Sequence, residues 1–423
     1  MADKTHKNKG RNFFSKLGPG LITGASDDDP SGILTYLQAG TVMGLRSLWT
    51  ALLTLPLMYG VQEMCGRIGF VTKKGLITLI KEYFSKGILY PIAFISVVVI
   101  TINLGADLLA IGVVLEKMFD VGRIFWIIAT AIIILFFTVF LSYKRFSKVL
   151  KWLTLSLFFY VAAVFYMKLD VKGSLLATFV PHFSWDKESI LLLTAIFGTT
   201  VSPYLFFWQT NEEAEDREEQ ARRRSLEKIS VTKNELKILK KDTLFGMLFS
   251  NVVMWFIMAG ATQLATTYGL KVITNFDDAS LVLQPLLGDM AYLFFSLGII
   301  GTGFLAIPIL AGCVGYIFSE IFNWKEGMNK TFTQAKGFYV AIGAATLVGV
   351  LLSALNLDPV QLLIYTAVFY TLITPFLILL ILRIGNDKKI MNHHVNSRGS
   401  NILGIGGLVV SSIITILYLS TFF

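Results

Sequence analysis

The feature that most restricts the fold of this chain is a group of acidic residues inside an apolar stretch that runs from about 13 to 40. Three aspartates are followed by a proline and a glycine, in the order Asp27, Asp28, Asp29, Pro30, Ser31, Gly32. A carboxylate at bilayer depth costs about 2.5–3.5 kcal/mol on insertion scales, so it persists only where it faces protein or a water-filled cavity. Pro30 removes a backbone donor and Gly32 loosens the chain, which together break the helix and free carbonyls. The pattern predicts a cation site in a broken membrane helix.

Composition supports a polytopic membrane protein, because 54% of residues are hydrophobic and only 15% are charged. Apolar runs long enough to span a bilayer, about 17–25 residues each, occur eleven times in the sequence. The expected spans are 15–40, 44–66, 88–115, 123–143, 149–169, 188–210, 243–268, 290–321, 334–355, 359–382 and 401–421. We therefore expect one all-α transmembrane domain, residues 1–423, in contact with the lipid bilayer.

The basic residues predict the orientation, because loops on the cytoplasmic side retain lysine and arginine. With a cytoplasmic amino terminus, 30 of the 37 basic residues fall on the inner side and only seven on the outer side. This topology accounts for the net charge of +9, so no nucleic-acid partner is needed to explain it. An odd number of spans places the carboxyl terminus outside the cell membrane.

A second interruption lies in the sixth apolar run, where Gly198, Thr199 and Thr200 are followed closely by Ser202 and Pro203. Interruptions at matching places in two halves are typical of inverted-repeat transporters, whose site lies where both helices unwind. We expect repeat one at about 13–170, repeat two at about 187–383 and an extra helix at 401–421. The polar segment 211–241 is predicted to be a cytoplasmic loop with a solvated helix.

These residues resemble the natural resistance-associated macrophage protein (Nramp) family of divalent-metal transporters. The resemblance lies in Gly18, Pro19 and Gly20, in Asp29 with Pro30, and in the segment 198–203, and it extends across the membrane part of the chain. It implies a LeuT-like fold of five plus five helices, with helices 1 and 6 unwound near Pro30 and Pro203, plus helix 11. It also implies a monomer that transports a metal ion and holds no permanent cofactor.

The departures from the family pattern suggest which ion is carried. Gly32 stands where the family has an asparagine ligand, and Thr199 and Ser202 stand where it has alanine and methionine contacts. A thioether suits transition metals, whereas carboxylate, hydroxyl, carbonyl and water oxygens suit Mg²⁺, Ca²⁺ and Mn²⁺. Mg²⁺ keeps several of its waters, so a roomy oxygen site suits it. The chain looks like the Nramp-related magnesium transporter branch, which implies Mg²⁺ import, with Mn²⁺ also carried, at a site of Asp29, Gly32, Thr199 and Ser202.

The same comparison predicts weak or absent proton coupling. Tyr204 takes the place of a sixth-helix histidine of the family, and Ala110 replaces an acidic residue one turn after Asp107. No imidazole is left in the broken helix to titrate near neutral pH. A divalent ion that moves inward through 100 mV gains about 2 × 2.3 kcal/mol, enough for roughly a thousandfold accumulation without protons.

Several further carboxylates are candidates for an ion path or vestibule. Asp27 and Asp28 are turned about 200° and 100° from Asp29 on a helix, so the three cannot converge unless the backbone unwinds. Each could line a vestibule or pair with a buried donor. Glu63 either lies on the exit path or pairs with Arg67, one turn later. Asp107 and Tyr204 complete the set of candidates.

Four other functions are alternatives to Mg²⁺ import. A proton-coupled Mn²⁺ or Fe²⁺ transporter of the Nramp type is the nearest alternative. An amino-acid carrier would place helix amino ends against a substrate carboxylate, which three aspartates would repel. An enzyme would need a nucleophile with its base or a set of ligating side chains, and the sequence contains no HExxH motif. A passive channel stays open as an alternative and is distinguished by single-channel currents.

Overall fold

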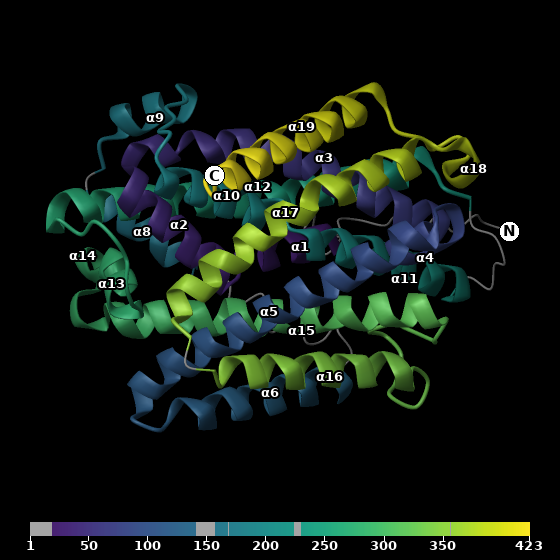
Figure 1. Ribbon diagram of the computed structural model, residues 1–423, viewed down its shortest axis with the longest axis horizontal. Helices are drawn as coiled ribbons and strands as arrows, with labels where there is room; N and C mark the ends of the chain where they lie inside the picture. Colours follow the sequence, from purple (N-terminus) through teal and green to yellow (C-terminus); the bar gives the residue numbers. More distant parts are fainter. Residues whose placement is uncertain (1–18, 141–156, 168, 224–229, 356) are drawn as a thin grey trace, which may run out of the picture.

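The structure is a computed structural model that describes residues 19–140, 157–167, 169–223, 230–355 and 357–423. Regular secondary structure in these residues is helical, and the long helices pack lengthwise into a bundle (Figure 1). The α-helices are α1 Pro19–Asp27, α2 Pro30–Met43, α3 Trp49–Thr72, α4 Leu76–Tyr83, α5 Lys86–Phe119, α6 Arg123–Phe140, α8 Phe158–Tyr166, α9 Val171–Phe179, α10 Lys187–Thr200, α11 Pro203–Arg223, α12 Lys233–Tyr268, α13 Phe276–Ser280, α14 Gln284–Leu287, α15 Ala291–Phe322, α16 Lys336–Ser353, α17 Pro359–Asn386, α18 Lys388–Met391 and α19 Arg398–Ser420. Short 3₁₀ turns are η2 Gly44–Ser47, η4 Leu281–Leu283 and η5 Gly288–Met290.

The membrane spans follow the apolar runs of the sequence. Among the described residues, eight helical stretches are long and apolar enough to cross a membrane, or nine with a pair bent by 108° between Pro30–Ser47 and Trp49–Thr72. The first, second and fifth spans expected from the sequence are not among these eight helical stretches. The first is divided into α1 and α2, the second is the far arm of the bent pair, and part of the fifth, 149–156, lies outside the described residues.

Burial separates the interior helices from those at the outside of the bundle. In the apolar window of the α10–α11 stretch 94% of residues are buried, compared with 28% for α6 and 22% for α19. The outward faces of α6 and α19 are apolar, with Ile132 and Ile402 both strongly exposed. An apolar exposed face suits lipid contact, whereas a helix buried on all sides positions residues for function. The interrupted sixth helix therefore lies in the interior.

Both predicted helix breaks are present. The first separates α1 from α2 at Asp28 and Asp29, and Pro30 opens α2 at a position where its missing N–H would have no helical partner. The second separates α10 from α11 at Val201 and Ser202, directly before Pro203. In both cases the residue before proline leaves the α conformation, which is the expected steric effect of the ring.

Close backbone contacts hold the broken helices against their neighbours. A Cβ at Gly198 on α10 would lie 1.7 Å from the Ala367 carbonyl oxygen on α17. On α1, a Cβ at Gly24 would lie 2.2 Å from the Gly246 backbone on α12. Both positions need glycine because neither neighbour is a movable side chain. α2 also packs against α10 and α12, so both breaks are positioned within one interior region (Figure 1).

The polar segment 211–241 differs from its prediction. α11 continues to Arg223 and α12 already begins at Lys233. Glu212, Glu213 and Arg217 are buried, so the expectation of a wholly solvated helix is wrong for the first part of the segment. The predicted surface character appears farther along, where Glu218 and Arg222 form an exposed i,i+4 ion pair at 3.7 Å. The periodic charges did not reveal that other helices cover this end of α11.

Candidate functional site

Asp29 is the centre of the candidate site, and two donors from different helices fix its carboxylate. It is the N-cap of α2, where its Oδ1 accepts a 2.7 Å hydrogen bond from the Gly32 amide. Its Oδ2 accepts a 3.0 Å hydrogen bond from Asn103 Nδ2 on α5. The side chain is buried, and each carboxylate oxygen keeps a lone pair for a further partner. Sequence reasoning missed Asn103, although an amide one turn before Asp107 in an apolar run was a signal for it.

Gly32 brings the two breaks together. A Cβ at this position would lie 3.1 Å from Thr199 Oγ1 and 3.5 Å from Asp29 Oδ1. The carboxylate from the first break and the hydroxyl from the second therefore both lie close to Gly32, where contacts of 3.1 Å are too tight for a side chain unless neighbouring atoms shift. The structure thus brings Asp29, Gly32 and Thr199 together, and their role as metal ligands stays a prediction.

Ser202 lies at the second break but turns its hydroxyl back onto α10. Its Oγ donates to the carbonyl oxygens of Gly198, at 2.9 Å, and Thr199, at 2.5 Å. The proton of this hydroxyl is therefore used to satisfy the end of α10, where carbonyls lack helical partners. What remains for an ion or its water is the lone-pair side of Ser202 Oγ.

Asp27 and Asp28 both contact α12, through Ser250. Ser250 Oγ lies 2.8 Å from Asp27 Oδ2 and 3.2 Å from Asp28 Oδ1. Both carboxylates are buried. Of the two alternatives raised from the sequence, the structure contains the pairing with a buried donor.

Asp107 is a further buried carboxylate near Asp29. It lies on α5 one turn after Asn103, on the same helix face, and neither of its oxygens has a hydrogen-bond partner in the described residues. A buried acceptor without a partner costs about 1–3 kcal/mol. The neighbourhood of Asp29 thus offers acceptors that a cation, its water or a proton would satisfy.

Tyr204 connects the two broken helices. Its hydroxyl, from the first turn of α11, donates a 2.8 Å hydrogen bond to the Ser26 carbonyl near the end of α1. Its ring packs against Tyr370 of α17, with 5.6 Å between ring centroids. Tyr204 stands where the family pattern has a histidine, and in this structure its side chain acts as a hydrogen-bond donor to the backbone.

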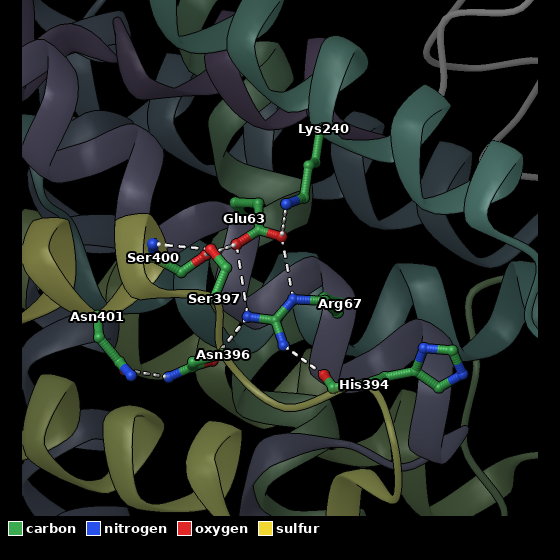
Figure 2. A network of polar contacts seen from close by, with 8 residues as sticks. All are labelled: Glu63, Arg67, Lys240, His394, Asn396, Ser397, Ser400 and Asn401. Atoms are coloured by element: carbon green, nitrogen blue, oxygen red, sulfur yellow. Dashed lines mark hydrogen bonds and ion pairs between the residues drawn. The ribbon is translucent and has the colours of Figure 1, made fainter.

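Glu63 belongs to a network between α3, α12 and the segment before α19, shown in Figure 2. Its Oε1 lies 3.0 Å from Arg67 Nε and 3.6 Å from Lys240 Nζ. Its Oε2 accepts a 3.1 Å hydrogen bond from Ser400 Oγ (Figure 2). The ion pair with Arg67 was one of the two alternatives, and the structure contains it.

Arg67 extends the network to the segment that leads into α19. Its Nη1 donates to the His394 carbonyl at 2.7 Å and its Nη2 to Asn396 Oδ1 at 2.6 Å, as Figure 2 shows. Arg67 and Glu63 are both buried. Sequence reasoning did not predict that the loop around His394 and Asn396 would meet α3.

A second acidic group lies where α11 and α15 meet, away from the helix breaks. Glu215 accepts from the Tyr316 hydroxyl and, at 3.1 Å, from the Met328 amide. In the loop after α15, burial together with the carboxylates of Glu320 and Glu215 raises the pKa of Glu326 to about 10. This group is built around structural donors and carries no feature of a transport site.

The donor set around Asp29 is made of oxygen. Within the described ranges, no three His, Cys, Asp or Glu side chains gather where they could hold a metal ion. A cation at Asp29 would therefore bind one carboxylate, hydroxyl and carbonyl oxygens, and water. Hard divalent cations prefer such a set.

Comparison with known proteins matches this architecture to one family over almost the whole chain. The family model described as "Natural resistance-associated macrophage protein-like", Nramp, matches residues 20–421. The chain belongs to the Nramp family. Its relatives include the divalent metal cation transporter MntH of Yersinia pestis, 23% identical over 92% of this chain and 91% of that protein. MntH of Staphylococcus saprophyticus is also 23% identical, over 99% of this chain and 94% of its own length. These relatives are transporters and not enzymes, and the chain is a multi-pass membrane transporter of the Nramp family.

Solved structures agree on the fold. A manganese transporter from Eremococcus coleocola superposes with a TM-score of 0.72 at 14% identity, over 98% of this chain and 88% of that one. MhsT, solved with L-phenylalanine, gives a TM-score of 0.66 at 14% identity, over 96% of this chain and 98% of that one. The predicted fold class is confirmed: the Nramp chain has the LeuT-like arrangement, with helices 1 and 6 broken. At these identities the likeness concerns the fold alone.

Proposed function

We propose that this Nramp chain imports divalent metal ions, with Mg²⁺ as the principal substrate and Mn²⁺ as a second one. The observation that carries the proposal is that the two helix breaks meet at Gly32, where a Cβ would lie 3.1 Å from Thr199 Oγ1 and 3.5 Å from Asp29 Oδ1. One buried carboxylate among neutral oxygen groups suits a hard cation that keeps part of its water shell. Relatives of this chain are named divalent metal cation and manganese transporters, which supports divalent metal as the substrate class.

The selectivity proposal rests on position 32 and position 202. Glycine at 32 removes the amide ligand that the family pattern has there, and serine at 202 presents oxygen where methionine would present sulfur. Both changes favour an ion that takes hard ligands and keeps part of its water. They support our proposal that the chain belongs to the magnesium-transporting branch of the family.

The transport mechanism we propose is alternating access of the two repeats around a fixed site. Asp29, Thr199 and Ser202 are all buried, with exposed fractions of 3% or less, so the described conformation excludes solvent from the site. Repeat one at 13–170 and repeat two at 187–383 would move relative to each other, with the amino terminus in the cytoplasm and the carboxyl terminus outside the cell membrane. We expect a monomer to be sufficient, since both breaks lie in one chain.

Proton-coupled Mn²⁺ or Fe²⁺ transport is the second candidate. Asp107 favours it, because its unpartnered carboxylate lies near Asp29 and could accept a proton. Against it, the Tyr204 hydroxyl is engaged with Ser26 and offers no titrating group near neutral pH. Weak or absent coupling is therefore the proposal.

Uptake into proteoliposomes with internal pH recorded in parallel tests both candidates. The native chain is expected to accumulate Mg²⁺ and Mn²⁺ under an inward-negative potential with little acidification. Asp29→Ala should abolish uptake, whereas Asp27→Asn, which faces Ser250, is the matched control and should retain it. Mg²⁺-dependent acidification equal to that of a proton-coupled relative, or native uptake in Asp29→Ala, would refute the proposal.

A further inference from the structure

Asn103 contacts the proposed ion site from a helix outside both breaks. It lies on α5, is fully buried, and donates from Nδ2 to Asp29 Oδ2 at 3.0 Å. The other oxygen of Asp29 is used as the cap of α2. The position of the carboxylate therefore depends on α5 as much as on its own helix.

The orientation of the Asn103 amide follows from its partner. A carboxylate only accepts hydrogen bonds, so the NH₂ group faces Asp29 and the amide oxygen faces elsewhere. That oxygen is buried and has no hydrogen-bond partner in the described residues. The Tyr370 hydroxyl lies beside the same amide.

Unpartnered polar groups at one place indicate a missing ligand. Asn103 Oδ1 and both oxygens of Asp107 are acceptors, and they lie one turn apart on the same face of α5. No lysine or arginine among the described residues forms an ion pair with Asp29 or Asp107 within 4.0 Å. Water molecules bound to a cation at Asp29 would supply the donors these acceptors lack.

We propose that Asn103 is a specificity-determining residue of the ion site: its NH₂ group fixes the Asp29 carboxylate, and its amide oxygen accepts a hydrogen bond from water carried by the cation. The proposal rests on the proposed function, because it assigns a role at the same site. A neutral amide suits both tasks, since it donates to the carboxylate and accepts from water without adding a charge that repels or traps the ion.

The role predicts a preference between ions. Mg²⁺ dehydrates more reluctantly than larger or softer ions and keeps several waters when bound. An acceptor for that water therefore favours Mg²⁺ over Mn²⁺. Loss of the amide should weaken the binding of both ions, and it should weaken the binding of Mg²⁺ more strongly.

The test uses Asn103→Ala and Asn103→Leu in the full chain. Mg²⁺ and Mn²⁺ uptake are measured against concentration in proteoliposomes, and the shift of the melting temperature by each ion is measured on purified protein. Ser96→Ala is the matched control, because Ser96 is also buried on α5 with an unpartnered hydroxyl. We expect the KM for Mg²⁺ to rise about tenfold in both Asn103 variants, with the maximal rate within threefold of native, as for a lost hydrogen bond to a charged group. The factor by which the KM for Mn²⁺ rises should be at least threefold smaller than the factor for Mg²⁺.

The outcomes separate this inference from the function on which it rests. If the native chain neither takes up Mg²⁺ nor is stabilised by it, the proposed function fails. If the native chain does both and the Asn103 variants keep native KM values, Asn103 has no role in selectivity. Equal losses in Ser96→Ala, or a lower maximal rate at native KM, would show a structural role instead and overturn the inference. Should Asn103→Leu fail to fold, Asn103→Ala carries the test alone, since it removes the same groups without adding volume.

Discussion

The Tyr204 hydroxyl donates a 2.8 Å hydrogen bond to the Ser26 carbonyl, and this contact joins the segment after one helix break to the segment before the other. Ser26 lies in the last turn of α1, where carbonyls have no partner within the helix. The tyrosine therefore satisfies a freed carbonyl and couples the two unwound regions.

Tyr204→Phe removes this donor and leaves the Ser26 carbonyl unsatisfied. We expect a loss of about 1 kcal/mol in the free energy of unfolding, measured by thermal melting, together with slower uptake. Tyr160→Phe is the control, because Tyr160 is equally buried but its hydroxyl has no hydrogen-bond partner among the residues that the structure describes. Equal stability changes in the two variants would contradict the role of the contact.

Ser202→Met tests whether oxygen at this position relaxes selection against hard ions. The thioether should favour Mn²⁺ and reduce Mg²⁺ uptake, since sulfur binds Mg²⁺ poorly. Competition between the two ions in liposome uptake gives the ratio, for which we expect at least a tenfold shift toward Mn²⁺. Ser202→Ala separates loss of the hydroxyl from gain of sulfur, and an unchanged ratio in Ser202→Met would remove the basis for the Mg²⁺ assignment.

Arg67→Ala should strongly destabilise the chain. It leaves the buried Glu63 carboxylate without its close partner, and breaking a buried ion pair on one side costs about 3–5 kcal/mol. Lys240→Ala provides the comparison, because Lys240 is 41% exposed and lies 3.6 Å from the same carboxylate. We expect less than about 1 kcal/mol for it. Melting curves in detergent measure both, and a similar small change in each would show that the network around Glu63 contributes little.

Gly198→Ala should disrupt the contact of α10 with α17, since the added Cβ would lie 1.7 Å from the Ala367 carbonyl oxygen. We expect poor folding yield and loss of uptake. Gly343→Ala on α16 meets no atom within 4 Å and should stabilise the helix by about 0.5–1 kcal/mol. Yield and melting temperature of the two variants give the comparison; a well-folded, active Gly198→Ala chain would mean that α10 and α17 separate readily.

Glu326 lies outside the membrane spans, and its raised pKa leads us to expect that stability depends on pH. Burial raises its pKa in the folded chain to about 10, so folding keeps the proton that the unfolded chain releases above its ordinary pKa near 4.5. The stabilising contribution is complete below that lower value and is lost as pH rises toward 10. Glu326→Gln should therefore melt at a higher temperature than the native chain at pH 8.5 and show a smaller difference at pH 5. Glu82→Gln, on the exposed ion pair with Lys74, should show neither change.

The helix breaks were predictable from sequence because proline acts locally. Pro30 and Pro203 each remove a donor and disfavour the helical conformation of the preceding residue. Pro56, Pro91, Pro308 and Pro375 lie inside continuous helices, so it was the polar and small residues beside Pro30 and Pro203 that distinguished the two breaks. The membrane spans were predictable for a similar reason, since apolar length alone sets what can cross a bilayer.

The partners of the acidic residues were less predictable. Asp27, Asp28 and Asp29 are adjacent in the chain, yet Asp29 meets Asn103 whereas the other two meet Ser250. Which direction each side chain takes depends on how far the backbone unwinds between α1 and α2. That in turn depends on contacts with α5 and α12, which lie far away in sequence.

The sequence by itself determined the membrane class, the two interruptions and the family, because these follow from composition, local backbone chemistry and motifs. Only the tertiary structure decided that Asp29 and Thr199 meet beside Gly32, that Asn103 holds the carboxylate, and that Tyr204 joins the two breaks. The physical reason is range: proline and apolar runs act through adjacent residues, whereas a binding site is made by side chains from separate helices whose relative positions are set by packing.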